Sequence, residues 1–298
     1  MSDWRALRLA VTAEQVAVVE QVLEDNGALA VTITDAEDNP LFEPPPGAAP
    51  LWPRCQIQAI FGQDEDDALL RAACQNALID ALGDAAPAIV ISDIQDQNWT
   101  RVWMDAFQPM RFGQRLWIVP SWHPCPDPEA VNLRLDPGLA FGTGTHPTTA
   151  LCLEFLDSLA SMPSRVLDFG CGSGVLALAA LMLGAQQADG TDIDPQALSA
   201  MQDNAQRNGF GSRVTTALPE DFHAEHPYPL VMANILSGPL QSLAPLLTQY
   251  LEPGGTLVLS GLLTEQAEAV MQAYPDIDFD APASLGEWCR LTGTKRKN

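Results

Sequence analysis

Lysine is nearly absent from this chain of 298 residues, which carries only Lys295 and Lys297, at its C-terminal end. With 15 Lys+Arg against 38 Asp+Glu, the formal net charge is −23. Proteins bind nucleic acids by placing cationic side chains against phosphates. The composition therefore disfavours a direct nucleic-acid substrate. It is compatible with electrostatic attraction of a basic macromolecular partner, although acidity that serves only solubility is an equally simple interpretation.

Other features are missing as well. No apolar run approaches the ~18 residues that span a bilayer, and the N-terminus shows no basic region followed by an apolar segment. We therefore expect a cytoplasmic protein without a membrane partner. The six cysteines form no C-x-x-C pair and the four histidines show no ligand spacing, so no metal is predicted.

The most informative segment that is present is 166–174, Val-Leu-Asp-Phe-Gly-Cys-Gly-Ser-Gly. It predicts a buried strand that carries Asp168, then a tight turn and a helix start. The turn contains three glycines at alternate positions, Gly170, Gly172 and Gly174. Because glycine lacks a Cβ, the backbone there can approach a ligand closely. A second acid, Asp192, follows another short strand, and the two signals together predict a nucleoside-bearing cofactor on an α/β sheet.

This motif alone leaves more than one class of protein open. The spacing Gly172-x-Gly174-x-x-Ala177, with an acid roughly 20 residues further on, also satisfies the relaxed dinucleotide pattern. The alternatives are an S-adenosylmethionine (SAM) methyltransferase and a nicotinamide or flavin oxidoreductase. A SAM-binding module without catalysis is a third.

The first ~98 residues follow a β-α-β-β-α-β pattern. Strands are predicted at 4–12, 29–34, 54–61 and 89–94, and helices at 12–26 and 64–82. This order is typical of a ferredoxin-like α+β domain, which we place at residues 1–94. Without a glycine-rich phosphate loop or a catalytic cluster, it is interpreted as a recognition domain.

A connecting segment, residues 95–110, follows this domain. Trp99, Trp103 and Phe107 recur at i, i+4 and i+8, which predicts one face of a short helix. Strands at 116–119 and 131–135 should then pair around a Pro-rich turn. The glycine-rich segment 136–149 enters a predicted helix at 148–159, and its hydroxyls and backbone N–H groups suggest a polar lid for a ligand.

From residue 165 onward, strands and helices alternate. Strands are predicted at 166–169, 188–191, 214–217, 230–234 and 256–260, with helices at 175–184, 195–208, 239–250 and 264–273. This predicts a parallel, doubly wound sheet in a catalytic domain, residues 111–298. A terminal antiparallel hairpin, 277–279 with 288–294, favours the methyltransferase version of the fold by analogy.

Ligands bind at the carboxyl ends of the strands in such a sheet. There, the Asp192 carboxylate can accept both ribose hydroxyls, while Asp194, before Pro195, is interpreted as a helix cap. Asn234 supplies one carbonyl acceptor and an NH₂ donor. No acid/base group for hydride transfer stands out in these loops, whereas methyl transfer mainly requires alignment of the reactants.

Four motifs together resemble the ribosomal protein L11 methyltransferase family over the whole chain. They are DPGLAFGTGTHPTT at 136–149, DFGCGSG at 168–174, DIDPQA at 192–197 and ANIL at 233–236. The resemblance implies a seven-stranded Rossmann-like SAM domain. It also implies methylation of lysine ε-amines and the N-terminal α-amine of L11, a basic protein, up to trimethylation.

The resemblance also implies roles for individual residues. Those expected to bind SAM are Thr143, Thr145, Asp168, Gly170, Gly172, Gly174, Asp192 and Asn234. Asn234 is also the expected catalytic residue, where many amino-methyltransferases have Asn-Pro-Pro-Tyr and this chain has Asn-Ile-Leu-Ser. The product would be S-adenosylhomocysteine, and a monomer is expected.

Overall fold

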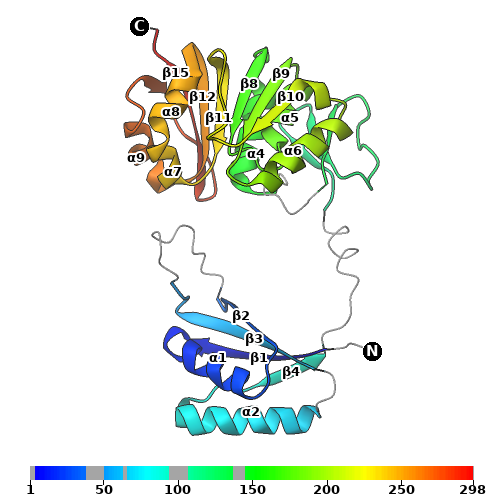
Figure 1. Cartoon of the computed structure of the whole chain (residues 1–298), viewed down its shortest axis with the longest axis vertical. Coiled ribbons are helices and arrows are strands. Elements are labelled where there is room, and N and C mark those ends of the chain that lie inside the picture. Colours follow the sequence, from blue (N-terminus) through cyan, green and yellow to red (C-terminus); the bar gives the residue numbers. More distant parts are fainter. Residues whose placement is uncertain (1–3, 38–49, 63–65, 94–106, 137–144, 298) are drawn as a thin grey trace. The chain divides into compact units, whose positions relative to one another are not determined.

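The computed structural model describes residues 4–37, 50–62, 66–93, 107–136 and 145–297 (Figure 1). The chain divides into two compact units, Met1–Met104 and Asp105–Asn298. Among the helices in the described ranges, none is long and apolar enough to cross a membrane.

The N-terminal unit is one sheet with two helices on one of its faces (Figure 1). Its elements are β1 (Trp4–Thr12), α1 (Val16–Asp25), β2 (Ala30–Asp35), β3 (Arg54–Gly62), α2 (Asp67–Leu82) and β4 (Val90–Asp93). The strands lie in the order β2-β3-β1-β4, and every pair is antiparallel. The elements thus follow the predicted order β-α-β-β-α-β.

Alternation along the strands explains why this sheet has one buried face. In β1, Leu7, Leu9 and Val11 are buried at every second position, and they pack against the apolar side of α1 and α2. Asp66 fixes the start of α2, because its side chain accepts hydrogen bonds from the backbone N–H groups of Ala68 and Leu69.

The C-terminal unit is built on one large sheet. Its strands are β8 (Arg165–Phe169), β9 (Gln187–Thr191), β10 (Val214–Ala217), β11 (Tyr228–Asn234), β12 (Leu251–Leu263), β13 (Ile277–Phe279), β14 (Ala283–Leu285) and β15 (Trp288–Lys295). The order is β10-β9-β8-β11-β12-β15-β13, with β14 paired to β15 beside this path. The first five strands of this order, β10, β9, β8, β11 and β12, are parallel to one another. The strand β15 runs antiparallel to β12 and β13. In the described residues the sheet therefore has eight strands, because β14 joins the seven expected.

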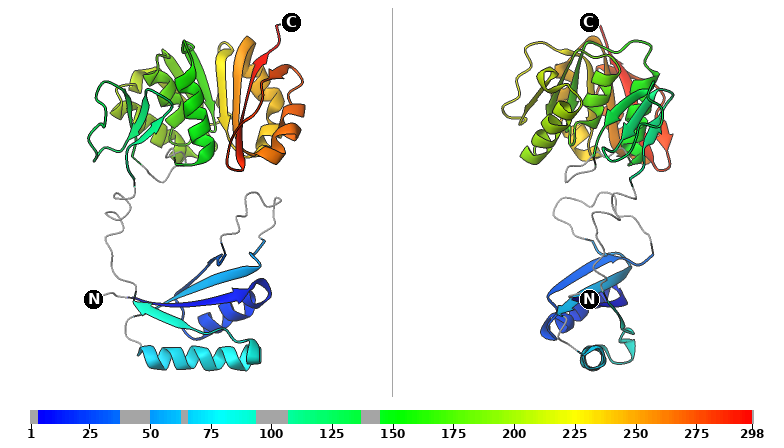
Figure 2. Two further views of the ribbon diagram at one scale, coloured as in Figure 1. Left: turned by 180° about the vertical axis from the view of Figure 1, so that it is seen from behind. Right: turned by 90° about the vertical axis from the view of Figure 1, so that its right-hand side faces the viewer.

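Helices cover both faces of this sheet, which Figure 2 shows from behind and from the side. They are α4 (Pro147–Ser158), α5 (Val175–Met182), α6 (Pro195–Arg207), α7 (Ser237–Ser242), α8 (Ala244–Tyr250) and α9 (Ala267–Gln272). The first three pack on the face that carries Val166 and Met232, and the last three on the face that carries Leu167 and Ala233. Adjacent strand residues thus enter opposite cores.

A second, three-stranded sheet packs against α4 and α5. It contains β5 (Met110–Phe112), β6 (Leu116–Val119) and β7 (Val131–Arg134). The predicted pair β6 and β7 forms, and the structure shows that it is parallel. Buried Asp157 of α4 accepts hydrogen bonds from the backbone N–H groups of Gln114 (2.6 Å) and Arg115 (3.3 Å). The predicted connecting helix lies mostly outside the described residues, with Trp99 and Trp103.

Tyr228 provides a test of the buried polar contacts of the large sheet. Its hydroxyl donates to the Asp189 carboxylate at 2.6 Å, and both side chains are buried. Replacing Tyr228 by Phe leaves that carboxylate with one donor fewer, so we expect the free energy of unfolding to fall by about 2 kcal/mol in urea denaturation. The matched control is Tyr250→Phe, whose hydroxyl makes only a 3.4 Å contact with the Phe222 carbonyl. Equal losses in both variants would contradict the interpretation.

Candidate functional site

The glycine turn joins the end of β8 to the start of α5. The backbone N–H groups of Gly170 (2.7 Å) and Cys171 (3.1 Å) donate to the Thr191 carbonyl at the end of β9. Gly170 has φ 77° and Gly174 has φ 79°, in the left-handed region that favours glycine. A Cβ on Gly170 would overlap Cγ2 of Ile235, which follows β11 directly. The turn therefore lies against the loop that begins with Asn234.

Asp192 ties this turn to the neighbouring strand end. One carboxylate oxygen accepts from the Gly172 backbone N–H at 2.9 Å, and the other accepts from the Asp194 backbone N–H at 3.0 Å. A carboxylate has about four lone-pair positions, so each oxygen keeps acceptor capacity for a ligand hydroxyl. Asp194 accepts from the Gln196 N–H at 2.9 Å and caps α6, which confirms its predicted role.

Asp168 lies beneath the turn and is 1% exposed. Its Oδ2 accepts from the Ala177 backbone N–H at 3.1 Å. Its Oδ1 is buried and has no hydrogen-bond partner in the part of the chain that the structure describes. Burial raises the pKa of this carboxyl to about 8, with a further contribution from the negative charge of Asp192. Asp168 is thus a protonated acid at neutral pH.

Asn234 lies at the carboxyl end of β11 and is half-buried. Its Nδ2 donates to Oγ1 of buried Thr149 at 3.2 Å. This contact orients the amide group. It leaves Oδ1 without a partner among the residues described, as an acceptor for an N–H group.

The start of α4 brings a second set of groups to the same edge of the sheet. The Nδ1 atom of His146 accepts from the Thr148 backbone N–H at 3.3 Å, and it lies 2.7 Å from Thr148 Oγ1. Because a backbone N–H can only donate, the neutral ring carries its proton on Nε2. Partial burial lowers the pKa of His146. The His146 ring also contacts the Trp288 ring edge-on, with centroids 4.6 Å apart.

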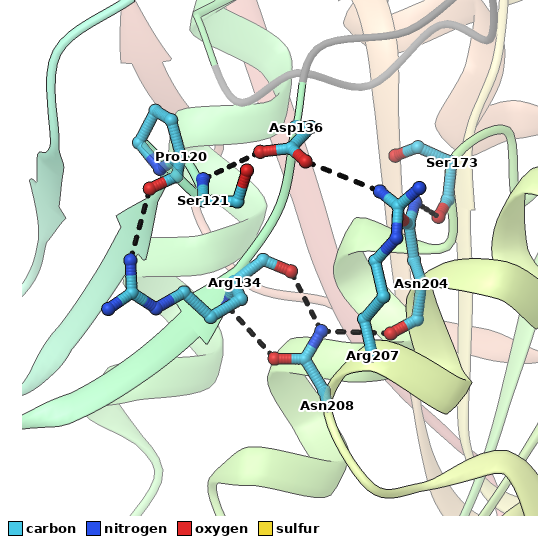
Figure 3. A network of polar contacts seen from close by, with 8 residues as sticks. All are labelled: Pro120, Ser121, Arg134, Asp136, Ser173, Asn204, Arg207 and Asn208. Carbon is cyan, nitrogen blue, oxygen red and sulfur yellow. Dashed lines mark hydrogen bonds and ion pairs between the residues drawn. The ribbon is translucent and has the colours of Figure 1, made fainter. Parts of the chain in front are cut away.

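A polar network connects the small sheet to the glycine turn through α6 (Figure 3). Asn208, which follows α6, accepts from the Arg134 N–H at 2.9 Å and donates to the Arg134 carbonyl at 2.7 Å. Asn204, one turn earlier, donates to the Ser173 carbonyl at 3.0 Å.

Asp136, the first residue of the glycine-rich segment 136–149, also belongs to this network. It accepts from the Ser121 N–H at 2.6 Å and pairs with Arg207 at 3.4 Å. Figure 3 shows Arg207 and Asn204 together on α6, between Asp136 and Ser173.

Most of the predicted site residues are brought together at one edge of the sheet. The glycines 170, 172 and 174, Asp168 and Asp192 form one cluster, and the Gly170–Ile235 contact adds Asn234. Thr145 is exposed and precedes His146, the N-cap of α4, and Thr149 of this helix accepts from Asn234. Thr143 lies outside the described residues.

Three residues of this edge were not predicted from the sequence. Thr149 belongs to the predicted polar segment 136–149, but its role as the partner of Asn234 depends on a contact between segments far apart in the chain, and so does the approach of Trp288. Ile193 had a signal: it is an apolar residue between two acids directly after a strand, and the structure shows it 86% exposed.

Neither metal ligation nor attack by a cysteine thiol is favoured by the described residues of this site. They contain no group of three or more His, Cys, Asp or Glu side chains that could hold a metal ion. Burial raises the pKa of the Cys171 thiol in the glycine turn, with the charges of Asp168 and Asp192 adding to the effect. This thiol is therefore protonated and a poor nucleophile.

Comparison with known proteins shows the family in which similar sequences are found. The profile of the family described as "Ribosomal protein L11 methyltransferase" matches residues 3–296. The ribosomal protein L11 methyltransferase of Ectopseudomonas mendocina is 55% identical over 295 residues, 98% of this chain and 99% of the relative. That of Azotobacter vinelandii is 53% identical, with the same coverage. A solved ribosomal protein L11 methylase from Lactobacillus delbrueckii subsp. bulgaricus is 31% identical, with a TM-score of 0.58 over 64% of this chain and 100% of that one.

The protonated state of Asp168 predicts a pH dependence of stability. With a pKa of about 8 when folded, against ~4 in an unfolded chain, the folded state binds more protons between these values. Its contribution to stability is therefore present at low pH and is lost as the pH rises from ~4 to ~8. We expect Asp168→Asn, which does not titrate, to flatten the fall of the urea midpoint between pH 5 and pH 8.

The control for this measurement is Asp194→Asn, which retains a capping side chain on α6. It should keep the wild-type slope. An unchanged slope in Asp168→Asn would show that this carboxyl is ionised in the folded protein.

Proposed function

Because the chain belongs to the ribosomal protein L11 methyltransferase family, and is therefore a methyltransferase, we propose that it transfers methyl groups from SAM to ribosomal protein L11. The acceptors in this proposal are lysine ε-amines and the N-terminal α-amine, each methylated up to three times. The observation that carries it is the contact of Gly170 with Ile235. This contact places the glycine turn, which is suited to a nucleoside cofactor, beside Asn234, whose Oδ1 can accept a hydrogen bond from an amine.

The residues of the turn suit SAM chemically. The remaining acceptor positions of Asp192 fit a ribose diol, and exposed Ile193 beside it offers an apolar surface to a flat adenine ring. The glycines leave room for the amino-acid end of the molecule, and Thr143 and Thr145 are proposed as further contacts. The buried Oδ1 of Asp168 needs a hydrogen-bond partner, which the ligand or a water molecule held by it would supply. When bound, SAM supplies a methyl group already activated on a sulfonium.

The protein's part in the reaction is to present a neutral amine in line with that methyl group. A lysine has an ordinary pKa near 10.4, so only about one in a thousand is neutral at pH 7. Removing water from the amine favours its neutral form, and proximity to a positive sulfonium has the same effect. In the first two transfers Asn234 Oδ1 accepts one amine N–H and orients the nitrogen lone pair. The neutral dimethylated amine has no N–H, so the third transfer depends on removal of water and on proximity alone.

No dedicated general base is needed in this mechanism. His146 is the nearest candidate in the described part of the edge, but its Nδ1 is engaged by Thr148. Its other ring nitrogen carries the proton, so the ring is a donor there rather than an acceptor. The proton of the amine is therefore lost to solvent before transfer.

The proposal assigns the recognition of L11 to the N-terminal part of the chain. We propose a ferredoxin-like recognition domain at residues 1–94, a helical linker at 95–110 and a catalytic domain at 111–298, acting as a monomer in the cytoplasm. The β-α-β-β-α-β order and the sheet order β2-β3-β1-β4 support the first assignment.

Two measurements on the purified protein test this function. Calorimetric titration should show binding of SAM and none of NAD. Incubation with radiolabelled SAM and purified L11 should place label on lysines and on the N-terminal amine, located by mass spectrometry. Binding of NAD alone would indicate an oxidoreductase, and binding of SAM without transfer to any protein would indicate a non-catalytic module.

Asn234→Ala tests the mechanism. Loss of the oriented acceptor should lower kcat for L11 by about a hundredfold, with a much smaller change in the Kd for SAM. The matched control is Asn132→Ala, which removes an asparagine of β7 that donates to the backbone carbonyls of Asp127 and Ala130 and should keep normal turnover. Normal turnover in Asn234→Ala would remove this residue from the mechanism. A single-turnover rate that rises with pH and levels off at an inflection below the ordinary histidine pKa would instead identify His146 as a base, because burial lowers the pKa of this ring.

A further inference from the structure

The N-terminal unit exposes large apolar side chains on the helical side of its sheet. On α2, Leu70, Cys74 and Leu78 enter the core, whereas Leu69 is 71% exposed and Ile79 is 48% exposed. Val18 of α1 is 39% exposed. We call the outward surface of α1 and α2 that contains these three residues the helical face. A helix that buries one apolar side and exposes another has surface available for a partner.

Charge is divided unequally between the two sides of this unit. The two helices with their flanking turns, residues 13–27 and 66–85, contain eight acids and a single base, Arg71. The four strands contain two acids and three arginines. Of the acids carried by these helical segments and strands, most therefore lie around the helical face, at both ends of α2 and along α1. One of them, Asp67, pairs with Arg5 of β1 at 2.7 Å.

The opposite face of the sheet offers a different surface. Its polar side chains bond to one another or to the strands: Arg8 donates to Gln58 at 2.8 Å, and Gln56 donates to the Leu9 carbonyl at 3.2 Å. Val90 of β4 is 61% exposed beside them. Trp4, at the start of β1, is 47% exposed and shares the parity of Arg8. In the described residues this surface therefore differs from the helical face mainly in charge, since its strands carry more arginines than acids.

We propose that the helical face is the surface on which the substrate protein docks. This inference rests on the proposed function, since it takes ribosomal protein L11 as the partner. Ribosomal proteins contact RNA phosphates and are accordingly rich in cationic side chains. The acids of α1 and α2 steer such a protein toward the helical face, and Leu69 and Ile79 then bury against it. Specificity of this kind lies outside the reacting site.

The test uses the full-length protein and purified L11. The double variant Leu69→Gln/Ile79→Gln should raise KM for L11 about tenfold, because two contacts in the centre of the interface lose their apolar character. The kcat at saturating L11 and the Kd for SAM should be unchanged. A second variant, Asp80→Lys/Asp84→Lys, should raise KM and reduce its dependence on NaCl concentration.

The matched control is Val90→Gln, an equivalent substitution at a comparably exposed site on the opposite face of the sheet. It should leave KM unchanged. An unchanged KM in the Leu69/Ile79 variant overturns the proposal, as does an increase confined to Val90→Gln, which would place the partner on the sheet.

Two further results separate this proposal from neighbouring ones. If Leu69→Gln/Ile79→Gln alters sedimentation from dimer to monomer without changing KM, the helical face joins two copies of the chain and the proposal fails. If the wild-type protein does not methylate L11 at all, it is the proposed function that fails. Each variant must melt at the wild-type temperature. If Leu69→Gln/Ile79→Gln does not fold, Leu69→Ala/Ile79→Ala takes its place.

Discussion

The close approach of Gly170 to Ile235 is the constraint on which the site depends. It leaves no space for a side chain at position 170, and it requires a backbone with positive φ. In return, the glycine turn after β8 touches the loop after β11. These are neighbouring strands in the sheet, so the proposed cofactor side and acceptor side of the reaction meet where Gly170 approaches Ile235.

The surrounding structure keeps this contact in place from two directions. On one side, Asn204 and Asn208 link α6 to the Ser173 carbonyl and to β7, as Figure 3 shows. On the other side, Ser260 of β12 donates to the Thr148 and Cys289 carbonyls, which joins α4, β12 and β15. Because α4 also carries Thr149, the orientation of Asn234 depends on the packing of a helix that comes much earlier in the chain.

Local patterns were sufficient to predict most of the elements, and long-range contacts explain what they missed. The bounds of β8, β9 and β10 agree with the predictions to within one residue, and the cap Asp194 marks where α6 begins. The strand β12 runs from Leu251 to Leu263, well beyond the predicted 256–260, because its pairing with β15 continues to Leu263. The strand β14 was missed because its three residues are largely exposed and are defined only by their pairing with β15. The parallel pairing of β6 and β7 likewise depends on packing against α5, which no local pattern reports.

The same distinction applies to the site. Glycine spacing and Asp192 could be recognised from the sequence, because a tight turn and a carboxylate at a strand end have local signatures. The protonation of Asp168 could not, since it results from complete burial under the turn. Nor could the contact of Trp288 with His146, which requires β15 to run antiparallel to β12 so that its first residue reaches the carboxyl edge.

An acidic protein attracts a cationic substrate, yet the amine to be methylated must be neutral when it reacts. The distribution of charge in this chain is compatible with both requirements. A carboxylate beside a lysine amine would stabilise its ammonium form, which has no lone pair to attack with. The groups seen to contact Asn234 are neutral: Thr149 bonds its side chain, and Ser260 is its partner in the sheet. Burial raises the pKa of Asp168 to about 8, which favours its protonated form at pH 7. A strongly acidic protein can therefore attract a cationic substrate without holding its amine in the unreactive form. For this the acids must act on the substrate protein away from the reacting amine, and the helices of the N-terminal unit with their flanking turns carry eight of them.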